Sequence, residues 1–399
     1  MPNGFKGLDC PVPGAMIDVT RLLDRRMQGR LPTGIDRVSL EYVRYFGHRS
    51  TALVRYAGQW IELSPQQSRR IFAALLAPAI NFTPLVRRTV ARAIPASFGR
   101  KFAQPRIMFH TGHNGLEKTD YANRLRRSRL RPLFFIHDLI PLTHPEYCRP
   151  GEARRHRSRM ETILTLGQGV IANSAATLDA LTAYARRNRL SLPPAVVAPL
   201  APAQLSAAEA CPLINRPYFV ILGTIEPRKN HWLLLQLWRR LIERWGTAAP
   251  SLVIIGQRGW ECENVVDLLE RCTSLRGFVH EYSACTDTEL AAWLRHARAL
   301  LFPSFTEGYG MPLVEALTLG VPVIASDLPV FREIAGRIPE YLDPLDGRGW
   351  WEMIEAYTAA EHPLRTAQLQ KIAGFFPPSW EDHFAQVEGL MEQMHGLAD

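Results

Sequence analysis

Short apolar runs alternate with longer amphipathic segments along most of the chain. The runs have the length of buried strands, and the amphipathic segments have the length and periodicity of helices. Strand-like runs lie at 15–20, 51–56, 60–63, 133–138, 168–172, 195–199, 218–223, 252–256, 276–280, 300–302 and 321–325, and helix-like segments lie at 34–46, 69–102, 150–167, 175–187, 231–245, 287–297, 313–319, 347–360, 363–374 and 379–396. This alternation predicts an α/β fold built on doubly wound parallel sheets.

The alternation lapses between residues 200 and 217, where the sequence is rich in Ala and Pro. Such stretches are typical of interdomain linkers, and 399 residues suffice for two domains with substantial cores. We therefore predict one Rossmann-like domain over 1–205 and a second over 206–378. A C-terminal helix is expected over 379–399.

Residues 299–335 combine a strand, a loop, a helix and a second strand. The apolar run at 300–302 is followed by a loop with Glu307 and the Gly-Tyr-Gly sequence at 308–310, and Pro312 then marks a helix start. Ligands bind at the carboxyl ends of strands in open α/β sheets. A helix start also offers backbone N–H groups to an anion. This stretch therefore predicts an anion-binding site.

Four charged residues could carry chemistry at that site. Glu307 and Glu315 flank the start of the predicted helix, and carboxylates suit the paired hydroxyls of ribose and hexose rings. Arg228 and Lys229 lie at another strand–helix junction, where two cations would hold a diphosphate. Taken alone, each of these residues is more often a solvated surface group. The chain contains no GxGxxG, P-loop or GxSxG motif.

Basic residues are concentrated in the first half of the chain. Residues 1–200 contain 31 Lys and Arg against 13 Asp and Glu, a net charge of +18, whereas the remainder contains 16 against 25, a net charge of −9, and the two sum to +9. This asymmetry predicts an anionic partner for the first half. Nucleic acid, acidic phospholipid and a phosphorylated acceptor all qualify.

The six cysteines form no CxxC pair and no His-containing zinc pattern, so a reducing compartment fits them. The first 14 residues lack the apolar core of a signal peptide. No apolar run approaches the roughly 20 residues that a membrane-spanning helix needs. We therefore expect a cytoplasmic protein.

Three segments resemble glycosyltransferase family 4: GTIEPRKNH at 223–231, FPSFTEGYGMPLVEAL at 302–317 and GVPVIASDLPVFREIAG at 320–336. The resemblance is strong over about 215–345 and weaker in the first half, where it rests on His137-Asp138 and Gly34. It implies the GT-B fold, in which two Rossmann-like domains with parallel sheets face each other across a deep cleft and C-terminal helices pack back towards the N-terminal domain. It also implies retaining chemistry. The domain over 1–205 would bind the acceptor and the domain over 206–378 the nucleotide sugar, and the helix over 379–399 would return to the first domain.

The resemblance assigns donor-binding roles in the second half. Arg228 and Lys229 would hold the donor diphosphate, whose charge grows as the sugar departs. Glu315 would bind the nucleotide ribose, and the N–H groups of Leu313 and Val314 would cap the phosphate at the helix start. Because Arg and Lys would balance the phosphate charge, neither an essential metal nor a cofactor is expected.

The sugar would be bound from both domains. Contacts to its hydroxyls are implied for Glu307 and for the backbone of the following loop, namely Gly308, Tyr309, Gly310 and Met311. His137 would reach the sugar from the first domain, and Gly34 would leave room for diphosphate and acceptor. Tyr282 lies near the expected nucleotide-base site, but Ser283 stands where the family usually has glycine. Asp36 and Asp138 are interpreted as helix or loop caps.

The function implied is retaining transfer of a hexose from a nucleotide sugar to a lipid-linked oligosaccharide in bacterial surface-polysaccharide (lipopolysaccharide) synthesis. No cleft carboxylate qualifies as a nucleophile, so the departing phosphate oxygen is expected to help deprotonate the acceptor. Similarity of IEPRKN and HDLIPL to bacterial mannosyltransferases favours GDP-mannose, with UDP-hexoses and dTDP-rhamnose open. The basic domain is expected to rest on anionic lipid at the inner face of the plasma membrane.

Three alternatives remain open from the sequence. A nucleotide-sugar epimerase or hydrolase would share the fold, although the Glu-x7-Glu pattern is typical of the transferases. A nucleic-acid-binding protein could use the basic half, but its Arg clusters lack interleaved aromatic residues and any recognised module. A carbohydrate-binding protein without catalysis would keep the same charged residues, so only turnover distinguishes it.

Overall fold

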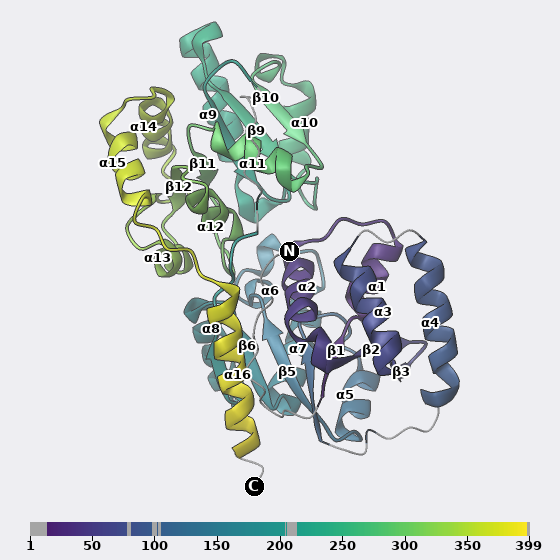
Figure 1. The fold of residues 1–399 in the computed structure, drawn as a ribbon. Helices are drawn as coiled ribbons and strands as arrows, with labels where there is room; N and C mark the ends of the chain where they lie inside the picture. The colour runs from purple at the N-terminus through teal and green to yellow at the C-terminus, as the bar shows by residue number, and fades with distance from the viewer. Residues whose placement is uncertain are drawn as a thin grey trace.

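Two open α/β sheets, one in each half of the chain, form the frame of the molecule (Figure 1). The structure is a computed structural model that describes residues 14–77, 81–97, 102, 105–203, 205 and 214–396. The predicted linker at 200–217 lies partly outside the described residues, because 204 and 206–213 are not among them.

The first sheet has the strand order β3-β2-β1-β4-β5-β6-β7. Its strands are β1 (Ala15–Asp18), β2 (Ser50–Tyr56), β3 (Gln59–Glu62), β4 (Arg106–His110), β5 (Leu130–Ile136), β6 (Gly169–Ala172) and β7 (Ala195–Val197). All neighbours pair in parallel except β2 and β3, which form an antiparallel hairpin at the edge. Strand order reverses between β1 and β4, which makes the carboxyl ends of these strands a topological switch point.

Eight α-helices accompany this sheet within the described part of the first half. They are α1 (Thr20–Met27), α2 (Gly34–Phe46), α3 (Pro65–Leu76), α4 (Phe82–Ser97), α5 (Thr119–Arg126), α6 (Ile140–Thr143), α7 (Glu152–Leu166) and α8 (Ala175–Arg187), with 3-10 turns η1 (Gly47–Arg49) and η2 (Pro145–Tyr147). The core is aromatic and aliphatic, with Phe109, Phe134 and Phe135 fully buried on the central strands. Their burial anchors the strand ends that face the second domain.

The second sheet is parallel throughout and has the order β10-β9-β8-β11-β12-β13. Its strands are β8 (Tyr218–Leu222), β9 (Ser251–Ile255), β10 (Val279–Tyr282), β11 (Leu300–Phe302), β12 (Val323–Ser326) and β13 (Glu340–Leu342). Strand order reverses between β8 and β11. The loops after these two strands contain Arg228, Lys229 and Glu307, so these predicted site residues lie at the switch point of the second sheet.

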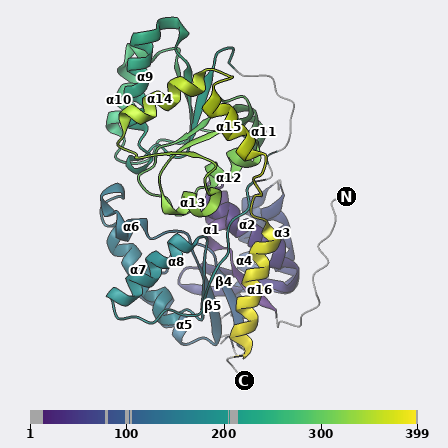
Figure 2. The same ribbon diagram turned by 90° about the vertical axis from the view of Figure 1, so that its left-hand side faces the viewer.

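Seven α-helices cover the second sheet in the described residues, and one more leaves it. They are α9 (His231–Trp245), α10 (Glu263–Arg271), α11 (Asp287–Arg295), α12 (Met311–Thr318), α13 (Pro329–Ala335), α14 (Gly347–Thr358), α15 (Pro363–Ile372) and α16 (Trp380–Gly396), with 3-10 turns η3 (Pro227–Lys229), η4 (Gly246–Ala248) and η5 (Thr273–Leu275). Figures 1 and 2 show α12 and α13 at the lower edge of the second domain, facing the first.

The last helix, α16, crosses back and packs on β6 and β7 of the first domain, as the GT-B fold class predicts. His383 is fully buried there; its Nδ1 lies 3.0 Å from the carbonyl oxygens of Ala198 and Pro199, and its Nε2 lies 3.0 Å from the Tyr42 hydroxyl. Because Nδ1 faces carbonyls, it donates, and Nε2 accepts from the tyrosine. Burial is the main reason that the pKa of His383 is lowered to about 4, so the helix stays docked with a neutral ring.

Seven of the described elements were not predicted from the sequence. They are the helices α1, α5, α6, α10 and α13 and the strands β4 and β13, and the run predicted as a strand over 15–20 ends at Asp18. The helix α1 is only eight residues long, and four of them are charged, so its short buried face (Thr20, Leu22 and Leu23) gives a weak signal in the sequence. Both missed strands are short and follow polar sequence.

Candidate active site

The loops after β8 and β11 meet at the carboxyl edge of the second sheet. Arg228 and Lys229 belong to the turn η3, and the Arg228 carbonyl accepts a hydrogen bond of 2.8 Å from the Phe305 N–H. The Arg228 guanidinium also donates to the carbonyl of Thr306, at 3.2 Å. The two loops predicted to bind the donor therefore form one hydrogen-bonded unit.

Two carboxylates and two cations form an ion-pair network in this unit. Arg228 contacts Glu226 (Nε–Oε1, 2.5 Å) and Glu307 (Nη1–Oε2, 2.7 Å). The other Glu307 oxygen lies 2.5 Å from Lys229 Nζ and accepts from the Ser304 hydroxyl at 2.7 Å. The network is largely buried, since the side chains of Lys229 and Glu307 are each only 8% exposed.

Glu307 is held in its ionised form. Burial opposes ionisation of this carboxyl, but the charges of Arg228 and Lys229 and the hydrogen bonds from Lys229 and Ser304 outweigh burial and lower its pKa to about 2. Burial raises the pKa of Glu226, a shift that Arg228 and Lys229 oppose. A diphosphate arriving here would compete with Glu307 for the two cations.

The start of α12 differs in detail from the prediction. Gly310 precedes the helix with a φ of +122°, where an added Cβ would lie 2.7 Å from the Phe331 ring, so glycine is required. The N–H groups of Leu313 and Val314, predicted to cap a phosphate, donate to the Gly310 carbonyl at 2.9 and 3.3 Å. This structure therefore does not present them to a ligand. Met311 is the first residue of the helix.

Glu315 lies on α12 and is buried, with only 6% of the residue exposed. Burial raises the pKa of its carboxyl to about 7, against the opposing charge of Arg37 on α2 and a hydrogen bond from the Ala203 backbone. Within the described residues it has no ion pair as close as those of Glu307. A buried carboxyl without a close cation is the kind of group that accepts ligand hydroxyls.

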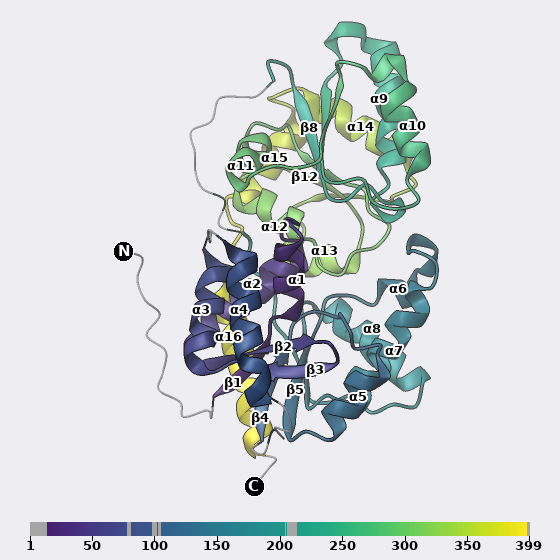
Figure 3. The same ribbon diagram turned by 90° about the vertical axis from the view of Figure 1, so that its right-hand side faces the viewer.

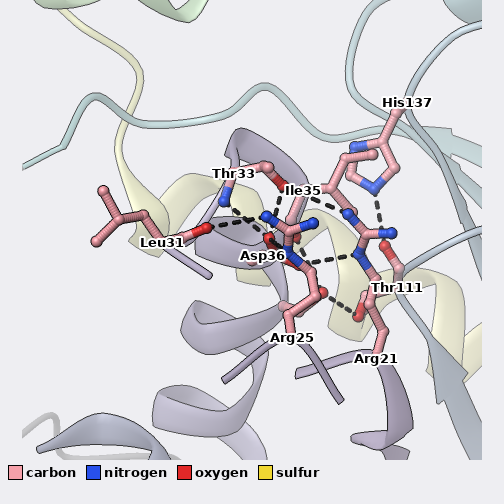
Figure 4. Close-up of polar contacts among 9 residues, drawn as sticks. Arg21, Arg25, Leu31, Thr33, Ile35, Asp36, Thr111 and His137 are labelled. Atoms are coloured by element: carbon pink, nitrogen blue, oxygen red, sulfur yellow. Dashed lines mark hydrogen bonds and ion pairs between the residues drawn. The ribbon is translucent and has the colours of Figure 1, made fainter. Parts of the chain in front are cut away.

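His137 forms the opposite wall at the end of β5. Its Nε2 lies 2.7 Å from the Thr111 carbonyl and therefore donates to it, as Figure 4 shows. Burial is the main reason that its pKa is lowered to about 4. Gly308 of the second domain approaches so closely that an added Cβ would lie 2.3 Å from the His137 carbonyl oxygen. The structure thus brings His137 and the Glu307 loop together across the cleft.

Three other predicted residues lie around this contact. Gly34 begins α2, is exposed, and an added Cβ would meet no atom within 4 Å, so the backbone borders open space. Tyr309 is buried, and its hydroxyl donates to the Leu200 carbonyl at 2.6 Å. Tyr282 is 37% exposed at the end of the edge strand β10, with its ring 5.1 Å from that of Trp293.

Asp36 and Asp138 are caps, as predicted. Asp36 accepts from the Thr33 N–H at 2.7 Å in a capping box at the start of α2, and Asp138 accepts from the Ile140 N–H at 3.0 Å. Asp36 also pairs with two arginines of α1 that the sequence reasoning missed: Arg21 Nε and Arg25 Nε each lie 2.8 Å from one of its oxygens (Figure 4).

Glu226 and Ser304 were also missed. Glu226 lies within the quoted IEPRKN sequence, two residues before Arg228, so an acidic residue beside a predicted cation pair was the available signal. Ser304 offered no signal, because serine is common in loops. Among the described residues there is no group of three or more His, Cys, Asp or Glu side chains arranged to hold a metal ion. No helix in the described ranges has both the length and the apolar character to cross a membrane.

The two facing sheets, the switch-point network and the returning C-terminal helix define a GT-B fold, as the resemblance predicted. In solved structures, HepE from Anabaena with UDP-glucose has a TM-score of 0.62 at 14% identity, covering 96% of this chain and 99% of HepE. This similarity shows a shared fold.

The family model described as glycosyl transferases group 1 matches residues 213–337, the segment that contains Arg228, Lys229, Glu307 and Glu315. The predicted family resemblance is confirmed over that segment. Serotype-specific mannosyltransferase WbdA of Escherichia coli is 28% identical over 245 residues, 56% of this chain and 29% of WbdA. The O-antigen chain mannosyltransferase B of Escherichia coli is 35% identical over 147 residues, 35% of this chain and 38% of that protein. The chain thus matches well under half the length of either relative.

Proposed function

We propose that the protein is a retaining glycosyltransferase that moves a hexose from a nucleotide sugar to a lipid-linked oligosaccharide in bacterial surface-polysaccharide synthesis. The observation that carries the proposal is the buried network of Arg228, Lys229 and Glu307 at the switch point of the second sheet, facing His137 across the cleft. The family match over 213–337 and the names of the mannosyltransferase relatives support it.

Arg228 and Lys229 would bind the diphosphate and stabilise the charge that develops on it as the sugar leaves. Glu307, released from these cations, would accept hydroxyl hydrogens of the sugar, and Glu315 would accept those of the ribose. The phosphate charge would be balanced by the two side chains, so the proposal includes no cofactor and no essential metal.

The contacts of the cleft carboxylates agree with a mechanism that retains the anomeric configuration without an enzyme nucleophile. Glu226 is ion-paired, Asp36 is held by two arginines, and Asp138 caps a turn. Glu307 pairs with Arg228 and Lys229 here and, once released by the diphosphate, would be engaged by sugar hydroxyls. None of these four carboxylates is left unengaged to attack an anomeric carbon. The departing phosphate oxygen would take the acceptor proton on the same face of the sugar.

The donor proposed is GDP-mannose, because several relatives are named mannosyltransferases. Thermal unfolding should be measured with GDP, UDP and dTDP, since a bound ligand raises the melting temperature by mass action. The best nucleotide then selects the nucleotide sugars for a turnover assay, and NMR of the product gives its anomeric configuration. An inverted product would contradict the mechanism, and a freely released epimer would indicate an epimerase.

The membrane part of the proposal rests on the helices α3 and α4. Residues 63–116 contain no Asp or Glu, and five arginines on these two helices are exposed: Arg69, Arg70, Arg87, Arg88 and Arg92. Figures 1 and 3 show α3 and α4 side by side on the outside of the first domain. Such a surface fits anionic lipid at the inner face of the plasma membrane, where a lipid-linked acceptor would be.

Co-sedimentation with vesicles tests this surface. Replacing Arg87, Arg88 and Arg92 by Gln should weaken binding to anionic vesicles by about 100-fold at low salt, at about 1 kcal/mol for each cation. Matched substitutions of exposed arginines in the second domain, at 271, 276 and 295, should have little effect. Equal binding to zwitterionic vesicles, or no loss in the first variant, would remove the membrane claim.

A further inference from the structure

The segment 173–177 follows β6 and includes the first turn of α8, and it forms hydrogen bonds both to the His137 backbone and to the Gly308 backbone. Asn173 Nδ2 donates to the His137 carbonyl at 2.9 Å. The hydroxyls of Ser174 and Thr177 donate across the cleft to the Gly308 carbonyl, at 3.1 and 3.0 Å. All three side chains belong to residues that are at most 4% exposed. One short segment therefore holds the backbone of His137 and that of Gly308.

The second domain also binds this turn through a carboxylate. Glu333 of α13 accepts from the Ala175 N–H at 2.7 Å and from the Ala176 N–H at 3.1 Å, one with each oxygen. These N–H groups lie in the first turn of α8, where the helix dipole favours a negative charge. Figure 2 shows α13 directly beside α8, and the two helices pack together. Charge and hydrogen bonding both favour this contact.

The Gly308 contact leaves no space for adjustment. An added Cβ would lie 2.3 Å from the His137 carbonyl oxygen and 2.7 Å from Asp138 Cβ. Because Gly308 directly follows Glu307, a fixed Gly308 carbonyl limits where the Glu307 side chain can point. The hydroxyls of Ser174 and Thr177 form these bonds only when the two domains meet. With the domains apart, water would replace the Gly308 carbonyl, and the Ser174 hydroxyl would keep its contact of 3.3 Å with Asn173 Oδ1.

We propose that segment 173–177 is a positioning element for the sugar-transfer reaction, an inference that rests on the proposed function. When the domains close, Ser174 and Thr177 fix the Gly308 carbonyl, and with it Glu307, relative to His137. Glu333 holds the closed arrangement by capping α8. Thr177, Ser174 and Glu333 are thus positioning residues, and none of them needs to touch the substrate.

Two substitutions test the element with little risk to folding. Thr177→Val keeps the shape and removes the hydroxyl, and Glu333→Lys reverses the charge at the helix start. The matched controls are Thr182→Val and Glu352→Gln. The Thr182 hydroxyl donates to the Leu178 carbonyl of the same helix, and Glu352 pairs with Arg348 within α14. Domain closure is measured by small-angle scattering with and without nucleoside diphosphate, and kcat, KM and melting temperature are measured for each variant.

Thr177→Val should lower kcat about tenfold, the equivalent of one lost hydrogen bond in the closed state. Its melting temperature should stay near that of the wild type, and Thr177→Ser should restore the rate. Glu333→Lys should shift the scattering towards an open form, whereas both controls should match the wild type. Unchanged kcat and closure in both variants would overturn the proposal, as would a kcat loss that follows melting temperature and is not rescued by serine. If the wild type turns over no nucleotide sugar, the scattering of Glu333→Lys still decides whether Glu333 holds the two domains in the closed arrangement.

Discussion

The two walls of the cleft each contain an arginine–carboxylate network, and the networks differ in charge balance. In the first domain one carboxylate, Asp36, faces two cations, Arg21 and Arg25, which are about a quarter exposed. In the second domain Glu226 and Glu307 balance Arg228 and Lys229, and the network is more deeply buried. Only the first network carries a surplus of positive charge.

The networks also differ in what they connect. Asp36 joins α1 to the start of α2 and caps that helix, so its partners are fixed by regular secondary structure (Figure 4). The Glu307 network instead joins two loops at strand ends, where a ligand that binds the cations can replace the carboxylate. This difference indicates a supporting role for the first network and a ligand-exchanging role for the second. The predictions below test that division.

The largest expected effect is on turnover. Lys229→Met removes the cation but keeps the length of the side chain, and it should lower kcat about 100-fold or more, because one stabilising group for the departing phosphate is lost. Arg25→Met in the first network should leave turnover near that of the wild type. Steady-state kinetics with the donor chosen by thermal shift measures both.

The comparison fails if Arg25→Met loses as much turnover as Lys229→Met while its melting temperature is unchanged. That result would mean that the first network also binds an anion of the substrate. Lys229→Gln serves as a second variant, because a polar side chain can still hydrogen-bond to Glu307 in place of the ammonium.

The unequal predictability of the two networks has a physical cause. Arg228, Lys229 and Glu307 could be predicted because each lies in the loop that follows an apolar strand, and parallel strands place such loops at one edge of the sheet. Their pairing with one another could not, since Lys229 and Glu307 are 78 residues apart and side-chain direction is set by the folded loops. Arg21 and Arg25 contributed only to the count of basic residues, because the helix that aligns them was not predicted.

Prediction of the strands from the sequence has the same limit, because it sees only local patterns. The central strands of the second sheet could be predicted from continuous apolar runs, which a strand buried on both faces requires. The strand β4 is equally central in its sheet and as long as β8, but its apolar run of three residues lies between Arg106 and His110. The Arg106 side chain reaches Glu62 at 2.6 Å. The position of β4 between β1 and β5 depends on pairing across the sheet, which a local pattern does not contain.

The second prediction concerns stability. Asp36→Asn leaves Arg21 and Arg25 without a counter-charge and weakens the cap of α2, so it should lower the free energy of unfolding by about 3–5 kcal/mol. The control, Asp327→Asn, breaks a pair with Arg332 in which both side chains are 48% exposed, and should cost at most about 1 kcal/mol. Urea unfolding measures both values. Equal losses would show that the first network is no more than a surface ion pair.

The smallest expected effect is the pH dependence of the free energy of unfolding that Glu315, in the second domain, produces. This carboxyl ionises near pH 4.5 when unfolded and near 7 in the folded protein, because burial disfavours its charge. Between these values the unfolded chain binds fewer protons, so stability falls as pH rises from about 4.5 to about 7. Glu315→Gln should remove a fall on the order of 3 kcal/mol. Glu307 contributes in a separate window, where stability is lost as pH falls from 4.5 to about 2.

Arg37, a charged residue of the first domain, provides a second test of this pH dependence. Arg37 of α2 lowers the pKa of Glu315 across the cleft and pairs with Asp287 at 2.5 Å. Arg37→Gln removes the attraction and leaves Asp287 to repel the carboxylate, so the fall in stability should extend above pH 7. Melting temperatures measured from pH 5 to 9 would show it, and Glu315→Gln should cancel the effect of Arg37→Gln. If the double variant keeps the shifted profile, another group titrates there, and the two walls are not coupled through Glu315.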